Sequence, residues 1–150
     1  MIGLLQRVTR GSVTVDGAVV GEIGTGLLVL VGVQAGDTAA QGARLLERLV
    51  TYRVFPDGDG RMNRSLEDIG GGLLLVPQFT LAAETRKGTR PGFSTAAAPA
   101  VGRELFDDLV ERAQARLPGR VRTGRFGADM QVALVNDGPV TFWLQVQAAD

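Results

Sequence analysis

Two short segments of the chain carry residue types that acyl chemistry uses. Within Pro77–Leu81, Gln78 and Thr80 supply an amide and a hydroxyl at the end of an apolar run, directly before a stretch of basic residues. Thr80 is the candidate nucleophile, but the surrounding sequence offers no base to activate it. The alternative interpretation is structural, because threonine is a common strand residue and Gln78 can simply be exposed.

The second segment, Asn136–Thr141, joins two strand-like patterns and contains a Gly138–Pro139 bond. Bonds before proline are the ones for which a cis peptide is feasible, although only about 5–6% of them are cis in folded proteins. On its own, the pattern predicts an ordinary turn.

The absence of two residue types restricts the chemistry further. The 150 residues contain no cysteine and no histidine. This excludes disulfides, thiolate nucleophiles, iron–sulfur clusters, cysteine or histidine zinc sites and a Ser-His-Asp triad. Catalysis must therefore use hydroxyls, carboxylates, arginines, backbone groups or the substrate itself, and we expect neither a metal nor a cofactor. A chain without cysteine also suits a reducing cytoplasm, which is the location we expect.

Composition indicates a single domain over residues 1–150, with 45% hydrophobic residues, 21% charged residues and no net charge. Fifteen of the sixteen basic residues are arginine, which suits forked phosphate contacts but can equally reflect genomic base composition. The longest apolar run, Leu27–Val33, is far shorter than the roughly 20 residues of a membrane span, so we expect no membrane contact.

Periodicity predicts the elements that position these segments. Apolar patterns predict strands over residues 2–9, 12–15, 18–21, 26–33, 73–80, 121–125, 130–135 and 141–147. Apolar residues at three- and four-residue spacing predict two helices, over 39–53 and 99–117. Asp16–Gly17 predicts a hairpin turn, and the stretch from 82 to 95 predicts a surface loop.

Two glycine-rich motifs imitate ligand sites. Asp57–Gly60 begins like a calcium loop, but Arg61 and Met62 stand where that loop needs an oxygen ligand and a glycine. Gly70–Gly72 is followed by a predicted strand, whereas a nucleotide-binding fingerprint needs a helix there. We interpret both motifs as turns.

Taken together, several segments resemble the D-aminoacyl-tRNA deacylase family. They are Gln6–Val8, Met62–Asn63, Pro77–Leu81, Gly88–Pro91, Phe126–Met130 and Asn136–Thr141, in the expected order across nearly the whole chain. The sequence departs from the family at Pro77, where serine usually precedes the Gln-Phe-Thr-Leu motif. Proline has neither a hydroxyl nor an amide donor, so no role of that serine carries over.

The resemblance implies a mixed α+β (α/β) fold, a mostly antiparallel, barrel-like sheet packed with two main helices. It also implies a homodimer, with active sites at the subunit interface, that hydrolyses the ester between tRNA and a D-amino acid or glycine. In that family a cis Gly-Pro bond enters the partner's active site, where its carbonyls receive the substrate's α-ammonium group. Carried over, Gly138 and Pro139 form the chiral filter and Arg7 orients it.

The resemblance implies further roles in the same site. Gln78, Phe79 and Thr80 line the reaction centre, and Phe126 and Met130 are the expected walls of a pocket for the terminal adenosine. The chemistry fits the composition, because a neighbouring ribose 2′-hydroxyl can assist the attack of water and no histidine is needed. Arg86, Lys87 and Arg90 in the surface loop are the candidates for contact with the tRNA backbone.

Two other functions remain open at this point. One is a deacylase of the same fold that removes mischarged L-alanine and has a trans Gly-Pro bond; the presence of Arg7 favours the D-specific branch. The other is a non-catalytic tRNA-binding editing module, for which fusion to a larger chain would be the mark.

Overall fold

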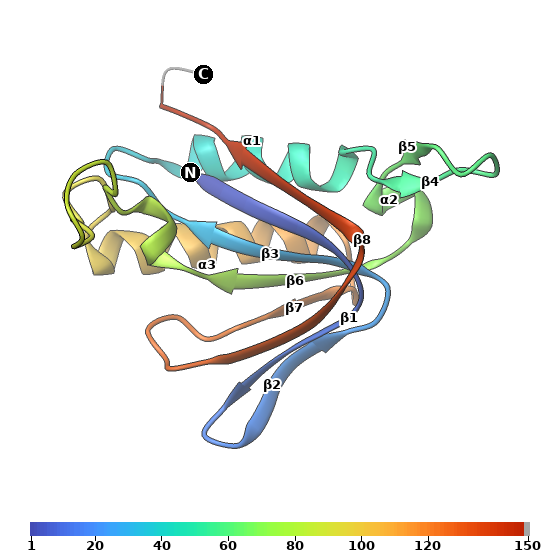
Figure 1. The fold of residues 1–150 in the computed structure, drawn as a ribbon, viewed down its shortest axis with the longest axis horizontal. Helices are drawn as coiled ribbons and strands as arrows, with labels where there is room; N and C mark the ends of the chain where they lie inside the picture. The colour runs from blue at the N-terminus through green and yellow to red at the C-terminus, as the bar shows by residue number, and fades with distance from the viewer. Residues whose placement is uncertain (149–150) are drawn as a thin grey trace.

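A curled six-stranded sheet with two long helices on one face forms the body of the protein (Figure 1). The structure is a computed structural model and describes residues 1–148. The strands are β1 (Ile2–Val15), β2 (Ala18–Ile23), β3 (Gly26–Gly32), β4 (Phe55–Pro56), β5 (Met62–Arg64), β6 (Gly72–Pro77), β7 (Val121–Thr123) and β8 (Gln131–Gln145). The helices are α1 (Ala39–Thr51), the short α2 (Leu66–Ile69) and α3 (Pro99–Arg116), with a 3₁₀ turn, η1 (Phe79–Ala82). Within residues 1–148, no helix is both long enough and apolar enough to cross a bilayer.

Strand β1 organises the sheet, whose order is β2-β1-β3-β6-β7. Its first half pairs with β3 and its second half with β2, while β8 follows its other edge along both halves. These pairings are antiparallel, whereas β3–β6 and β6–β7 are parallel. The sheet curls until β2 meets β7, since a Cβ on Gly21 would lie 2.6 Å from the Thr123 carbonyl oxygen. The expected mixed α+β fold with a mostly antiparallel, barrel-like sheet is therefore confirmed.

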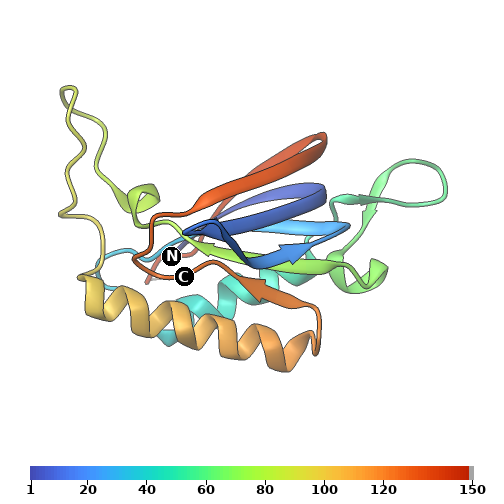
Figure 2. The ribbon, with the colours of Figure 1, turned by 90° about the horizontal axis from the view of Figure 1, so that it is seen from below.

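Two apolar cores hold these layers together. The larger lies between the sheet and the helices α1 and α3, which cover the same face (Figure 2). The smaller fills the inside of the curl, with Val13 from β1, Leu28 from β3 and Leu74 from β6 among its members. Strand β3 contributes to both cores, which explains why its sequence is a continuous apolar run.

Local sequence signals account for several element ends. Thr38 and Gln41 form a reciprocal capping box at the start of α1, with the Thr38 amide donating to Gln41 Oε1 at 2.7 Å. Asp16 and Gly17 both have positive φ, as the predicted β1–β2 hairpin turn requires. Gly70 ends α2 in the left-handed conformation, which confirms the turn expected there.

Some predicted boundaries were wrong, and pairing explains why. The strands predicted at 2–9 and 12–15 are one strand, β1, because β8 pairs across their junction. The strands predicted at 130–135 and 141–147 are likewise one strand, β8, so Asn136–Thr141 does not reverse the chain. Strand β6 ends at Pro77 and not at residue 80, as a residue without an amide hydrogen favours.

A close approach of two glycines fixes the register of β3 and β6. Gly26 lies opposite Gly72, and a Cβ on Gly26 would be 1.9 Å from the Gly72 carbonyl oxygen. In this register Val31 lies opposite Pro77 at the carboxyl ends of both strands. The glycine pair therefore sets which residues meet at that edge of the sheet.

Candidate active site

The Gln78–Thr80 segment lies where the parallel strands β3 and β6 end. The Gln78 amide donates to the Val31 carbonyl at 2.8 Å, which extends the ladder by one bond before the chain turns into η1. The first turn of a helix leaves amide N–H groups without intrahelical partners, and within residues 1–148 the amides of Phe79 and Thr80 make no other hydrogen bond, so they are available as donors. The edge of the sheet thus presents two backbone donors next to an amide and a hydroxyl side chain.

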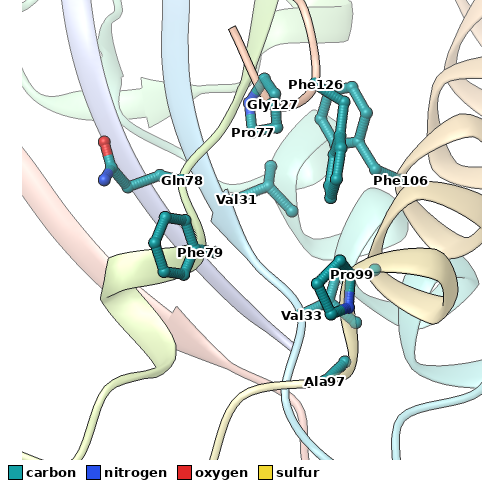
Figure 3. A pocket seen from close by; sticks show the side chains of 11 residues that line it. Val31, Val33, Pro77, Gln78, Phe79, Ala97, Pro99, Phe106, Phe126 and Gly127 are labelled. Carbon is teal, nitrogen blue, oxygen red and sulfur yellow. The ribbon is translucent and has the colours of Figure 1, made fainter. Parts of the chain in front are cut away.

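A mostly apolar cavity of about 250 Å³ opens beside this segment. Phe79 lies on one side of Val31, and Phe106 and Phe126 lie on the other (Figure 3). Gly102 of α3 packs beside Phe126, since a Cβ there would lie in ordinary van der Waals contact with the ring, at 3.4 Å. The walls are Val31, Val33, Pro77, Gln78, Phe79, Ala97, Pro99, Gly102, Phe106, Phe126 and Gly127. Such a cavity suits a flat, weakly polar group.

The hydroxyl of Thr80 is held by an amide and not by a base. Gln78 Nε2 donates to Thr80 Oγ1, and within residues 1–148 that oxygen makes no other hydrogen bond. A neutral amide donor stabilises the hydroxyl oxygen but cannot remove its proton. Within residues 1–148 the geometry therefore gives Thr80 no base to activate it, and its exposed side chain is not among those that line the cavity.

The Gly138–Pro139 segment forms an excursion from β8. Thr141 pairs with Gln6 of β1, whereas the next pair is Asn136 with Val8, so the residues between them bulge outwards opposite Arg7. The Gly138–Pro139 peptide bond is cis. Gly138 has φ of 146°, and a Cβ there would lie 2.7 Å from the Val140 side chain, so only glycine fits.

Arg7 ties this excursion to the body of the protein. Its Nε donates to the Asp137 carbonyl at 2.8 Å and its NH1 donates to the Val54 carbonyl at 2.7 Å. The Arg7 side chain is largely buried, at 12% exposure, and its Nε lies 3.8 Å from the Asp137 carboxylate. The backbone immediately before Gly138 is thereby fixed against the segment that follows α1.

Within one chain, the two groups of candidate residues do not form one site. Arg7 lies opposite Leu27, near the start of β3, and Pro77 lies opposite Val31, near its end. Four residues of extended strand separate these pairs by about 13 Å. The cavity and the Gly138–Pro139 excursion therefore lie towards opposite ends of the sheet.

Comparison with known proteins assigns this geometry to a family. The family model described as D-Tyr-tRNA(Tyr) deacylase matches residues 4–145. The chain belongs to this deacylase family. It is 64% identical over 146 residues to the D-aminoacyl-tRNA deacylase of Thioalkalivibrio sulfidiphilus, with 97% of each chain covered. It is 63% identical to that of Pseudomonas entomophila, with 97% and 100% covered. The chain is thus an enzyme, a hydrolase of the D-aminoacyl-tRNA deacylase class, as the resemblance implied.

Solved structures agree with the fold of this deacylase. A structure titled c-Myc DNA Unwinding Element Binding Protein matches with a TM-score of 0.94 and 36% identity, covering 99% of this chain and 100% of the other. A structure titled as a probable eukaryotic D-amino acid tRNA deacylase matches with a TM-score of 0.82 over 97% and 98% of the chains. At 21% identity, the second comparison speaks for the fold alone.

The other predicted site residues of the deacylase are divided between the cavity and its surroundings. Phe126 stands in the cavity wall, where Arg103 covers its ring at 5.0 Å from the centroid. Met130 instead packs against the smaller core, with its Sδ 3.4 Å from the Arg125 amide. Of the two proposed adenosine-pocket residues, the structure therefore brings only Phe126 to this cavity.

The basic loop, residues 84–92, projects from the cavity end of the deacylase (Figure 2). Backbone bonds between Glu84 and Gly92 close it, and Lys87 and Arg90 are exposed on it. Arg86 is exposed but paired, since its side chain donates to both oxygens of Glu84. These bonds hold the pKa of the Glu84 carboxyl below its usual value.

Sequence reasoning missed the α3 side of the cavity and one aromatic residue. Pro99 and Gly102 were explained only as parts of a helix, although a glycine inside a helical pattern can signal close packing. Phe93 packs on Phe79 with ring centroids 5.2 Å apart, and both rings are largely exposed. No periodicity in the loop sequence marks Phe93, because its partner comes from a different segment.

Proposed function

We propose that this deacylase hydrolyses the ester between tRNA and a D-amino acid or glycine, and that it rejects L-aminoacyl-tRNA through Gly138 and Pro139. The observation that carries the proposal is the apolar cavity beside the free backbone donors of Phe79 and Thr80. A terminal adenine fits such a cavity, and its ribose would then place the ester at the donors. Because aminoacyl-tRNA is the substrate, we infer that the enzyme works in the cytoplasm.

The chemistry needs positioning more than it needs a protein base. The Phe79 amide donates to the developing oxyanion, and one such donor contributes about 10² to 10³ in rate. The ribose 2′-hydroxyl relays the proton from the attacking water to the leaving 3′-oxygen. The water oxygen bonds to the acyl carbon as the ester bond breaks, which yields the free amino acid and tRNA.

The chiral filter requires a second copy of the chain. Arg7 and the excursion it fixes lie about 13 Å along the sheet from the cavity, so the excursion does not reach the cavity of its own chain. In a dimer, the excursion of one protomer would enter the cavity of the other. The carbonyls of Gly138 and Pro139 then receive the α-ammonium group, and their backbone occupies the space of an L-side chain. Glycine passes because it has no side chain to exclude.

Deacylation of four substrates tests the proposal on one purified sample. We expect ester loss from D-Tyr-tRNA and Gly-tRNA, little loss from L-Tyr-tRNA and L-Ala-tRNA, and a dimer by light scattering. Preferred hydrolysis of L-Ala-tRNA would instead assign the enzyme to the L-alanine branch. Tight tRNA binding without ester loss would make the protein a non-catalytic module, and an active monomer would refute the shared site.

A substitution of Thr80 tests whether the Thr80 hydroxyl or a water molecule attacks the acyl carbon. Because Thr80 Oγ1 is held by Gln78 and not by a base, Thr80→Ala is expected to keep activity within about tenfold of the wild type. A tRNA that ends in 2′-deoxyadenosine should instead lose most of its turnover. Single-turnover rates with both tRNAs measure this, and an acyl group trapped on Thr80 would reverse the assignment.

Neutralising the basic loop tests its contact with tRNA. Replacing Arg86, Lys87 and Arg90 together by glutamine should weaken tRNA binding and lower the salt dependence of log K by about 0.7 to 0.9 per lost phosphate contact. Most of the loss should come from Lys87 and Arg90, because Arg86 is already paired with Glu84. Arg112→Gln on α3 is the control, and an unchanged salt slope in the triple variant would remove this loop from the interface.

A further inference from the structure

Two side chains hold the excursion of β8 in place, those of Arg7 and Asn136. Arg7 holds the Asp137 carbonyl, the last backbone acceptor before Gly138. On the other side of the dipeptide, the Val140 amide donates to Asn136 Oδ1 at 2.7 Å. The dipeptide therefore lies between two backbone groups that are each fixed by a side chain.

Asn136 closes the base of the excursion with both ends of its amide. While Oδ1 accepts from Val140, Nδ2 lies 2.9 Å from Thr141 Oγ1 and 3.3 Å from the Val140 carbonyl. Nδ2 also lies 3.4 Å from Gln6 Oε1 on the neighbouring strand β1. One side chain thus joins the outgoing and returning parts of β8 to each other and to β1.

The excursion needs such an anchor because it has left the ladder. Between the Gln6–Thr141 and Val8–Asn136 pairs, β8 makes no regular pairing with β1. Pro139 has no amide hydrogen, so it cannot donate a bond of its own. The side chains of Arg7 and Asn136 supply the constraints that the missing ladder bonds would otherwise give.

We propose that Asn136 is the positioning residue that sets the placement of the Gly138 and Pro139 carbonyls, and hence the discrimination between D- and L-aminoacyl-tRNA. This inference rests on the proposed function. Arg7 fixes the direction in which the excursion leaves β8, and Asn136 fixes the point at which it returns. Without the second anchor, the dipeptide swings about its Arg7 contact, and the α-ammonium acceptors lose their alignment.

The amide of Asn136 combines an acceptor and a donor, which makes graded substitutions informative. Asn136→Ala removes every contact of the side chain. Asn136→Asp keeps the acceptor for the Val140 amide but places a second oxygen against the Val140 carbonyl. We therefore expect the alanine variant to be the more impaired and the aspartate variant to be intermediate.

The test compares kcat/KM for D-Tyr-tRNA and L-Tyr-tRNA, together with the melting temperature and the dimer content. Asn136→Ala is expected to lower the D-to-L ratio of kcat/KM by about tenfold, the worth of one to two hydrogen bonds. Gln41→Ala is the matched control, because Gln41 also accepts local hydrogen bonds from Thr38 but caps α1. It should lower the melting temperature and leave the D-to-L ratio unchanged.

Each outcome decides a different point. An unchanged ratio in folded, dimeric Asn136→Ala would overturn the inference, and so would an equal fall of the ratio in Gln41→Ala, which would indicate general loosening. If the alanine variant does not fold, the aspartate variant carries the test, and an unchanged ratio there refutes the role. A wild-type enzyme that fails to hydrolyse D-Tyr-tRNA would instead refute the proposed function itself.

Discussion

Replacing Arg7 by glutamine is expected to slow D-aminoacyl-tRNA hydrolysis by about 10²-fold while leaving the protein folded. The guanidinium group makes two hydrogen bonds to backbone carbonyls, of Asp137 and Val54, at 2.8 and 2.7 Å. Hydrogen bonds to a charged group each contribute about 1.5 to 3 kcal/mol. A glutamine cannot reach both acceptors, so the excursion loses its connection to the segment after α1.

Arg7→Lys is the matched variant, because it keeps the charge but offers a single ammonium group, whereas the guanidinium group of Arg7 reaches the carbonyls of both Asp137 and Val54. It should recover part of the activity. The measurements are single-turnover rates for D-Tyr-tRNA and L-Tyr-tRNA, with circular dichroism as the check on folding. Full activity and full rejection of the L-substrate in Arg7→Gln would show that the excursion is held without Arg7.

A methyl group on Gly26 should have the largest effect on stability. A Cβ there would lie 1.9 Å from the Gly72 carbonyl oxygen, which is backbone and cannot rotate away. Strands β3 and β6 must move apart, and overpacking of this kind costs about 3 kcal/mol or more. For a chain of this size, Gly26→Ala should lower the melting temperature by about 10 °C.

Gly24→Ala is the control for this prediction. Gly24 lies two residues before Gly26, in the connection between β2 and β3, and a Cβ there would meet nothing within 4 Å. Thermal unfolding of both variants gives the comparison, and the control should stay within about 0.5 kcal/mol of the wild type. Equal stability of the two variants would contradict the close approach of β3 and β6. If only Gly26→Ala loses stability, this variant should also lose activity, because the same register places Val31 opposite Pro77 at the cavity.

The parts of the fold that depend on local sequence were predictable. The apolar run of β3, the Asp16–Gly17 turn and the capping residue Thr38 each carry their signal within a few residues. The continuity of β8 was not predictable in this way. Gly138–Pro139 has the sequence of a turn, and it becomes an excursion only because β1 pairs with the strand on both sides of it.

The residues of the candidate site also divide into those with a local sequence signal and those that only tertiary contacts bring together. Gln78 and Phe79, which line the cavity, could be proposed from the sequence because a strand end and a family motif coincide there. The partner of Arg7 lies 130 residues away, so no sequence pattern around Arg7 indicates the Asp137 contact. The α3 wall of the cavity was missed for the same physical reason, since Gly102 and Phe126 meet only through tertiary packing.

The distance between the cavity and the excursion has a genetic consequence. If each site takes its cavity from one protomer and its excursion from the partner, a chain damaged only at the Phe79 side and a chain damaged only at Gly138–Pro139 are both inactive alone. A mixed dimer of the two, however, contains one site built entirely from undamaged parts. Random pairing at equal expression would restore about a quarter of the sites, so the two mutant alleles should complement each other in one cell.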